Sequence, residues 1–411
     1  MRARWLCLAA LALALVPALA GCGGVGSSTA AENVGEQLTI YSSLPLQGPE
    51  GGISQQIVGG EKLALSNAGG HVGRFTVSYT SLDDSSPTTG EWDPGVTASD
   101  AKAAAQDPTT IAYLGDFNSG ATAISLPLTN AAGILQVSPA SPYVGLTSSL
   151  DANEGEPERF YLTGKRTFGR VAPGDQVQAA AQVALLRKLG VHRLYAIVDQ
   201  DPFDTPLSEI VESDAEHAGI KVVGNDTIAI APGSSFANEA AKVAESGAQA
   251  VFVSATATTE AAELFRELHA SAPHVSLLAS ATMLNSLFAS HLGAAEAATF
   301  VGSPVLAARL YPASAQGVLA EYRQRFAAAG EPYALYGYEA MSVVLAAIRA
   351  AGNSGDDRQA VIDKFFATHD RQSVLGVYSI LPSGETTLSD YAIDRIVDGA
   401  PVFWRAFDTS G

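Results

Sequence analysis

Ser119 is the side chain in this sequence that could most readily act as a nucleophile, because it lies in the polar run Asp-Phe-Asn-Ser-Gly that follows an apolar stretch. A serine nucleophile needs a neighbouring base, most often a histidine. All seven histidines come just before predicted strands or at or after the ends of predicted helices, on the edge opposite the ligand-binding edge of a β/α fold: His71, His192, His274, His217, His269, His291 and His369. The G-x-S-x-G, P-loop and H-E-x-x-H patterns are also absent. We therefore expect Ser119 to cap a helix or bind a ligand, and we expect no enzymatic activity.

Three carboxylates in one loop, Asp199, Asp201 and Asp204, could suggest a calcium site. A calcium loop of the EF-hand type needs Gly at its sixth position and Glu at its twelfth. Counted from Asp199, these positions hold Asp204 and Ile210. We therefore interpret the three aspartates as solvated loop carboxylates and a helix N-cap, and we expect neither a metal nor a cofactor.

The composition excludes several classes of protein. The 411 residues include 24 Lys and Arg against 42 Asp and Glu, which gives a formal net charge of -18. Such a charge opposes binding to a phosphate backbone, so we exclude nucleic acid as a partner. With 47% hydrophobic residues, the chain can form a large core, and its length predicts two domains or one large α/β body.

Short β-rich runs alternate with helical patterns from Leu38 onward, which predicts an α/β fold with mainly parallel sheets. Three helical patterns follow the last of these runs and precede a tail. Gly376 begins the tail, which we interpret as a three-stranded antiparallel meander over 376–381, 391–397 and 401–406. We predict earlier strands at 38–44, 75–81, 111–114, 134–137, 193–198, 221–228, 250–254, 275–278 and 299–302.

The order of these elements predicts two Rossmann-like lobes. A Pro- and Gly-containing stretch at 148–174 interrupts the alternation after four strands, as expected for a crossing between lobes. We predict three crossings, near Arg170, Pro304 and Leu375. Lobe 1 would then comprise residues 37–170 plus 304–375, and lobe 2 residues 171–303 plus 376–408.

Polar residues follow the predicted strands at the sheet edge where α/β proteins bind ligands. Hydroxyls, amides and glycines dominate these segments, with one or two aromatics. Such a lining predicts a small polar ligand. Because Ser119 and helix N-termini favour negative charge, we expect that ligand to carry a carboxylate.

The N-terminus has the pattern of an export signal. Arg2 and Arg4 precede an apolar run at 6–16, and Leu-Ala-Gly-Cys follows at 19–22. This tetrapeptide resembles the bacterial lipobox, which implies a lipoprotein signal peptide at 1–21 and a lipid anchor at Cys22, followed by a flexible tether to residue 36. The alternative is ordinary secretory cleavage that leaves a free thiol. No later stretch is long and apolar enough to span a bilayer.

Several motifs resemble those of one known family, the extracellular solute-binding proteins of branched-chain amino acid ABC transporters, which have the periplasmic binding protein type I fold. The resemblance covers nearly all of the chain after the signal. Its most specific parts are LPLQGP at 44–49, YLGDFNS at 113–119, VSPA at 137–140, FGRVAPGDQ at 168–176 and GVY at 376–378 with DG at 398–399.

The resemblance implies two lobes that close on one small ligand, such as an amino acid or a related carboxylate or amide, and hand it to a membrane permease. We also expect an exported monomer, and the lipobox implies that it is anchored to the outer face of the cytoplasmic membrane. A hydroxyl matching Ser119 and main-chain groups at 140–142 would hold a carboxylate. The expected ligand-binding residues are Asn118, Ser119, Gly120, Ala140, Ser141, Phe203, Thr256, Ser280 and Thr282.

One departure concerns the ligand's amino group. The family's acidic partner for this group falls near residues 280–282, where the chain has no carboxylate. Either Asp116 or Asp201 takes that role, or the ligand has no ammonium. Two other functions stay open: a ligand-sensing regulatory lipoprotein on the same fold, and an exported hydrolase that uses Ser119 or the aspartates.

Overall fold

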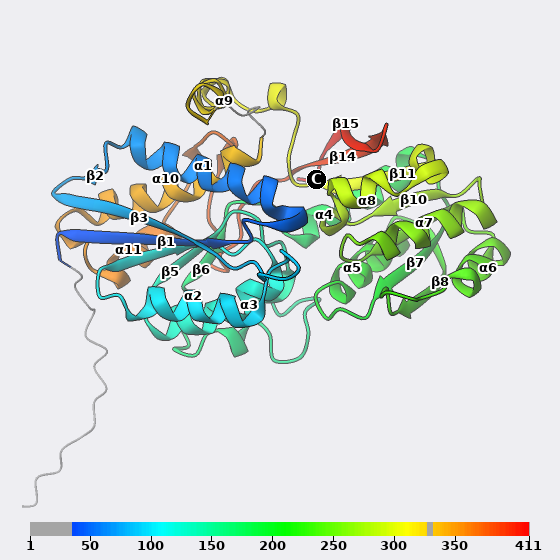
Figure 1. The fold of residues 1–411 in the computed structure, drawn as a ribbon, viewed down its shortest axis with the longest axis horizontal. Helices are drawn as coiled ribbons and strands as arrows, with labels where there is room; N and C mark the ends of the chain where they lie inside the picture. Colours follow the sequence, from blue (N-terminus) through cyan, green and yellow to red (C-terminus); the bar gives the residue numbers. More distant parts are fainter. Residues whose placement is uncertain (1–34, 327–331, 411) are drawn as a thin grey trace, which may run out of the picture.

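The computed structural model describes residues 35–326 and 332–410, which form two α/β units side by side along the long axis of the molecule (Figure 1). The predicted signal peptide, Cys22 and most of the tether lie outside the described residues. No helix within the described ranges is long and apolar enough to cross a membrane.

The first unit contains a six-stranded sheet. Five strands are parallel, in the order β3-β1-β4-β5-β6, and a two-residue strand, β2, is antiparallel at the edge beside β3. In chain order these strands are β1 (Gln37–Leu44), β2 (His71–Val72), β3 (Phe75–Asp83), β4 (Thr110–Leu114), β5 (Leu135–Ser138) and β6 (Phe168–Arg170).

Helices cover both faces of this sheet. One face packs against α1 (Gly51–Asn67), α10 (Tyr333–Ala351) and α11 (Arg358–Phe366), with α9 (Ala313–Phe326) outside them. The other face packs against α2 (Pro94–Gln106) and α3 (Ser119–Ala131). Alternate residues of the sheet face the two helical layers: Ile40 lies with α1 and α10, whereas Tyr113 lies with α2.

The second unit has a seven-stranded sheet in the order β15-β14-β11-β10-β9-β7-β8. Strands β7 to β11 run parallel, and the hairpin of β14 and β15 adds two antiparallel strands beside β11. The strands are β7 (Arg193–Asp199), β8 (Lys221–Ile228), β9 (Ala250–Ser254), β10 (Ser276–Ala279), β11 (Thr299–Ser303), β14 (Asp390–Val397) and β15 (Ala400–Asp408).

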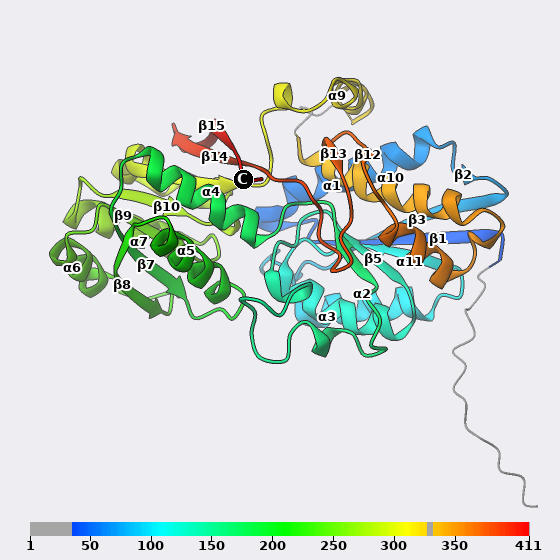
Figure 2. The same ribbon diagram turned by 180° about the vertical axis from the view of Figure 1, so that it is seen from behind.

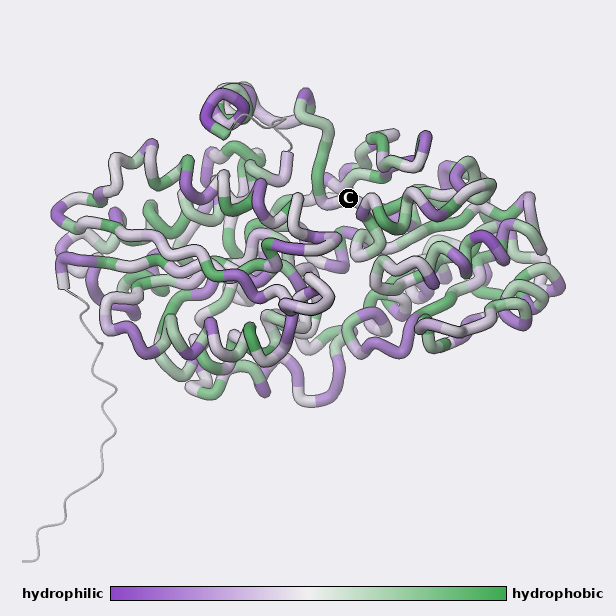
Figure 3. Tube along the Cα trace, viewed as in Figure 1, coloured by the Kyte–Doolittle hydropathy of each residue, from purple (hydrophilic) through white to green (hydrophobic). Residues whose placement is uncertain are grey.

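The helices of the second unit also form two layers. One face of the sheet packs against α4 (Asp175–Lys188) and α5 (Thr205–His217). The other packs against α6 (Ala237–Ser246), α7 (Thr259–Ser271) and α8 (Ser286–Ser290). Hydrophobic stretches run along the strands between these layers (Figure 3). The expected architecture, two α/β units with mainly parallel sheets, is confirmed.

The prediction for the tail was partly wrong. The β14–β15 hairpin exists, but the first strand of the expected meander does not join it. Val377–Tyr378 forms β13, which pairs with β12 (Arg371–Gln372) in a separate two-stranded sheet beside the first unit (Figure 2). The reason is burial: Tyr378 lies in the core with α10, and its hydroxyl donates to Glu339 at 2.7 Å. The chain therefore joins the second sheet only at Asp390, later than the expected crossing near Leu375.

Candidate ligand-binding site

A cavity of about 130 Å³ lies where the carboxyl ends of the two sheets face each other. The first unit contributes residues that follow β1, β3, β4 and β5, and the second contributes residues that follow β7, β9 and β10. For scale, an engineered cavity of about 150 Å³ in another protein binds benzene. The cavity therefore has the size for a small organic molecule.

Seven of the nine expected ligand-binding residues line this cavity. They come from the β4–α3 junction, from the loop after β5 and from three loops of the second unit: Asn118, Ser119, Gly120, Ala140, Phe203, Thr256 and Thr282. The carboxyl-end rule thus places these side chains together although they are spread along more than 160 residues of sequence.

Ser141 and Ser280 lie behind the lining instead. The Ser141 hydroxyl shares a 2.6 Å hydrogen bond with Thr122 and donates to the Asp116 carbonyl at 2.9 Å. Ser280 shares a 2.6 Å hydrogen bond with Thr282, which lines the cavity. We correct the expectation for both: they support the loops of the site from inside the protein.

Ser119 is the first residue of α3 rather than its N-cap, which is Asn118. Its hydroxyl accepts a 3.3 Å hydrogen bond from the backbone N–H of Tyr143. Asn118 makes no side-chain cap hydrogen bond, so the N–H groups of the first turn keep no side-chain partner. All seven histidines lie within the described residues, and none lines the cavity, as the sequence predicted.

A carboxyl group and an amide form a pair in the first unit that the sequence analysis did not single out. The Asn118 side-chain N–H donates to Glu50 Oε1 at 3.0 Å, and both residues line the cavity. Glu50 Oε2 and Asn118 Oδ1 are buried without a hydrogen-bond partner. Burial raises the pKa of Glu50 to about 7, although the hydrogen bond from Asn118 acts in the opposite direction.

Three further carboxyl groups line the cavity from the second unit: Asp175, Asp201 and Asp204. Asp204 is the N-cap residue of α5, the role expected for one of the three aspartates, although its side chain makes no cap hydrogen bond. It is not solvated, because it is 5% exposed and accepts a 3.1 Å hydrogen bond from Ser254. Burial, and then the nearby Asp201 charge, raise the pKa of Asp204. Burial also raises the pKa of Asp175 to about 6, against the opposing effect of Arg170.

Asp116 does not line the cavity, which removes it as a partner for a ligand's amino group. It follows β4 and is fully buried. Its carboxylate accepts a 3.0 Å hydrogen bond from the Tyr113 hydroxyl and contacts Ser125. Of the two aspartates considered from the sequence, Asp201 alone lies at the cavity.

Aromatic side chains form much of the remaining wall: Trp92, Phe117, Tyr143, Phe203, Tyr333 and Tyr391. Of these, Tyr333 and Tyr391 lie within a helix and a strand, so the search of post-strand loops missed them. Trp92, just before α2, was missed as well. The one sequence feature that could have indicated Trp92 as a lining residue is a Trp in a loop with few other aromatics.

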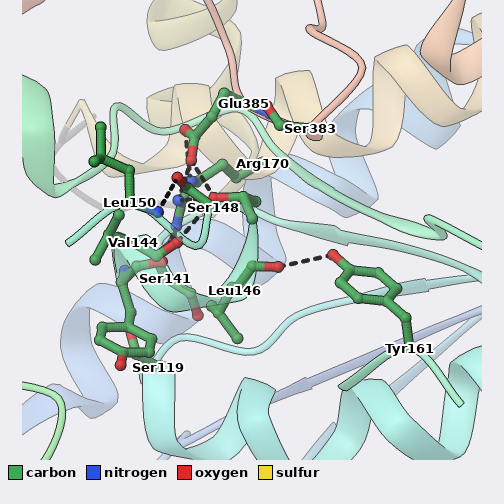
Figure 4. Close-up of polar contacts among 12 residues, drawn as sticks. Ser119, Ser141, Val144, Leu146, Ser148, Leu150, Tyr161, Arg170, Ser383 and Glu385 are labelled. Carbon is green, nitrogen blue, oxygen red and sulfur yellow. Dashed lines mark hydrogen bonds and ion pairs between the residues drawn. The ribbon is translucent and has the colours of Figure 1, made fainter. Parts of the chain in front are cut away.

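A buried ion pair supports the loop after β5 from behind (Figure 4). Arg170, at the end of β6, is 0% exposed and donates to the carbonyls of Ser141 at 2.7 Å and Tyr143 at 3.0 Å. Its guanidinium also pairs with Glu385 and donates to Thr147. Burial alone would raise the pKa of Glu385, but the charge and hydrogen bonds of Arg170 hold it below its usual value. The network fixes the loop that presents Ala140 and Tyr143 to the cavity.

The aspartates at the end of β7 and in the loop after it have separate partners rather than a common centre. Asp199 accepts from the backbone of Gln200 and Ile230, and Asp201 accepts from the backbone of Phe203 at 2.8 Å. Within the described residues, no group of three or more His, Cys, Asp or Glu is placed to hold a metal ion.

Comparison with solved structures shows the same fold in several transport proteins. The leucine-binding protein LivK of Thermotoga maritima is 17% identical with a TM-score of 0.72, and the alignment covers 90% of this chain and 99% of that one. An ABC transporter substrate-binding protein from Desulfitobacterium hafniense, in complex with Leu, is 19% identical with a TM-score of 0.73, covering 90% and 100%. An ABC transporter solute-binding protein from R. palustris, in complex with benzoate, is 16% identical with a TM-score of 0.69, covering 90% and 96%.

The sequence itself matches a family profile over most of its length. No curated protein sequence matches the chain. The profile described as "Periplasmic binding protein" matches residues 38–400, which include every residue that lines the cavity and nearly all of both sheets except β15. This chain belongs to the periplasmic binding protein family.

Proposed function

We propose that this protein is the extracellular solute-binding receptor of an ABC importer and that it binds one small molecule in the cavity between its two units. The observation that carries the proposal is that both units line the same cavity. A ligand that contacts both units favours the closed arrangement, because it binds that arrangement better than the open one. A membrane permease would then recognise the closed form.

Contacts across the cavity support closure as the mechanism. Asn153, in the loop before β6, donates a 3.1 Å hydrogen bond to the carbonyl of Pro202 after β7. The rings of Tyr143 and Phe203 also meet there. We propose lobe 1 at residues 37–170 plus 304–389 and lobe 2 at 171–303 plus 390–408, so that the third crossing follows the packing of Tyr378. The protein would act as a monomer and leave its ligand chemically unchanged.

The N-terminal pattern completes the proposal. Cleavage before Cys22 and lipidation of its thiol would hold the protein on the outer face of the cytoplasmic membrane. Two or more acyl chains are needed for stable attachment. We expect Cys22→Ala to release the protein from washed membranes into the soluble fraction, while the parent protein stays with the membranes.

Small-angle scattering tests the binding function directly. A library of metabolites is first screened by thermal shift, where a ligand at one hundred times its Kd stabilises by about 2.7 kcal/mol. The best binder should reduce the radius of gyration of the protein and be recovered unchanged. Binding without compaction, or conversion of the ligand to a product, would contradict the proposal.

A further inference from the structure

The charged residues of the cavity all have the same sign. No lysine, arginine or histidine lines it. The four charged residues of the lining are all acidic: Glu50, Asp175, Asp201 and Asp204. Within the part of the chain that the structure describes, none of the four forms a direct ion pair. Such a cavity repels a carboxylate and attracts a cation.

The neutral groups that contact these carboxyls do not replace a counter-charge. Asp204 has a serine hydroxyl as its partner and Asp175 a glutamine amide at 3.2 Å. Both side chains are at least nine-tenths buried. A buried carboxylate without a counter-charge is costly, and the raised pKa of Asp204 reports that cost. At Asp175, the charge of Arg170 offsets only part of the cost of burial.

A second, independent feature indicates that the ligand supplies hydrogen-bond donors. Glu50 Oε2 and Asn118 Oδ1 are buried acceptors without partners, and both residues line the cavity. The amide orientation follows from the hydrogen bond that Asn118 Nδ2 donates to Glu50 Oε1. A ligand that supplies N–H groups would satisfy both oxygens, whereas a carboxylate would leave them unsatisfied.

The walls suit the same ligand. The aromatic rings of Trp92, Phe117, Tyr143 and Phe203 line the cavity next to the carboxyls. A desolvated cation over an aromatic face gains about 0.5–2 kcal/mol. Aromatic walls also accept the apolar body of an organic molecule.

We propose that the ligand of this cavity is a small organic cation, with an ammonium or guanidinium group held between Glu50 on one side and Asp201 and Asp204 on the other. This inference rests on the proposed function, in which the cavity is the solute site, and it replaces the carboxylate that the sequence led us to expect. Glu50 precedes α1 in the first unit, and the two aspartates follow β7 in the second. A cation between them offsets the repulsion of like charges and so favours closure.

The test compares ligands with a common body and different charge. Isothermal titration of the mature protein would use phenethylamine, phenylalanine and phenylacetate, which share a phenyl ring but are a cation, a zwitterion and an anion. Agmatine and choline add two further cations, and leucine and benzoate add the ligands found in the structural neighbours. At least one of the three cations should bind about tenfold or more tightly than phenylacetate.

Variants that remove one carboxylate each then test which residues of the cavity bind the cation. Glu50→Gln and Asp204→Asn keep the size of each side chain and should each weaken the cation about tenfold. Glu245→Gln removes the same charge from the exposed face of α6, outside the cavity, and should leave binding unchanged. Thermal unfolding of each variant checks that it folds.

The outcomes separate this inference from the proposed function. If leucine, phenylalanine, benzoate or phenylacetate binds more tightly than all three cations, the protein is a solute receptor and the cation inference is wrong. If a cation binds but neither cavity variant weakens it, the inference is wrong as well. If no compound of any charge class binds, in this panel or in the metabolite library, the proposed function itself is wrong.

Discussion

The ring of Tyr143 meets the ring of Phe203 edge to face, with centroids 5.1 Å apart and an interplanar angle of 86°. Tyr143 follows β5 of the first sheet and Phe203 follows β7 of the second, so this pair joins the two units at the cavity. Edge-to-face pairs contribute about 0.5–1.5 kcal/mol beyond their buried area.

Phe203→Ala should weaken ligand binding by roughly three- to tenfold, because the closed form loses this pair. Calorimetric titration with the best binder from the library measures the change, and scattering should show less compaction at the same ligand concentration. Phe403→Ala, in β15 and away from the lining, provides a matched loss of a partly buried ring. Equal affinity in the parent and Phe203→Ala proteins would contradict a role for the pair in closure.

Gly120 has no room for a side chain at the start of α3. A Cβ there would lie 2.8 and 2.9 Å from ring atoms of Trp92 and 3.2 Å from Phe203 Cε2. Gly120→Ala should therefore displace both rings and weaken ligand binding, with little loss of the free energy of unfolding, because the rings lie at the cavity surface. Titration and chemical denaturation measure the two effects.

The control for Gly120→Ala is another helical glycine. Gly317 lies inside α9 with no atom within 4 Å of an added Cβ. Gly317→Ala should leave ligand binding unchanged and stabilise the protein by about 0.5–1 kcal/mol, because alanine favours the helix. Loss of ligand binding in Gly317→Ala, or unchanged ligand binding in Gly120→Ala, would show that steric displacement of the two rings does not control binding.

The sequence was sufficient to predict the sheet framework and one part of the cavity. Nine predicted strands are present, and buried parallel strands such as β4 and β9 are continuous apolar runs with clear ends. Asn118, Ser119 and Gly120 were found because they follow such a run directly. β6 has three residues inside a Pro- and Gly-containing stretch, which is too short for a pattern to stand out.

The remaining errors concern contacts between residues distant in sequence. The tail was misplaced because Tyr378 is held by Glu339, 39 residues earlier. The acidic character of the cavity was also missed. Glu50 lies in the post-strand segment after β1 and Asp175 is a helical residue, but the sequence does not show that they face Asp201 and Asp204 until the two units are placed together.

The Arg170–Glu385 pair should be strongly coupled. Arg170→Met should destabilise the protein by about 3–5 kcal/mol, because it leaves the largely buried carboxylate of Glu385, 17% exposed, without its counter-charge and removes the donor to two loop carbonyls. The double variant Arg170→Met with Glu385→Leu should lose less than the sum of the single variants. Urea denaturation of the four proteins gives the coupling energy.

A surface arginine provides the comparison for this cycle. Arg74 is exposed and pairs with Glu36 and Asp356. Arg74→Met should change the free energy of unfolding by no more than about 1 kcal/mol. The contribution of Glu385 should be present at neutral pH and be lost as the pH falls through its lowered pKa. Additive single effects would show that the pair is not coupled.

The ligand-free protein should become less stable as the pH rises from about 4.5 to 8. Burial raises the pKa of Asp84 to about 8, with a further increase from Asp116, and burial also raises the pKa of Glu61 to about 8. Between the unfolded and folded pKa values, the folded state binds more protons than the unfolded state, so each pH unit favours unfolding. This contribution is complete below the unfolded pKa and is lost as the pH passes the folded value.

Asp84→Asn tests this assignment, because the amide keeps the shape of the side chain and cannot ionise. Asp84 Oδ2 accepts from Thr97 at 3.2 Å, whereas Oδ1 is buried without a partner. An amide N–H at the Oδ1 position adds no charge, so the variant should unfold with a smaller dependence on pH than the parent between pH 5 and 8. Urea denaturation at four pH values measures both slopes. A parent protein whose stability rises over this range, or a variant with the parent's slope, would show that these buried carboxyls do not control it.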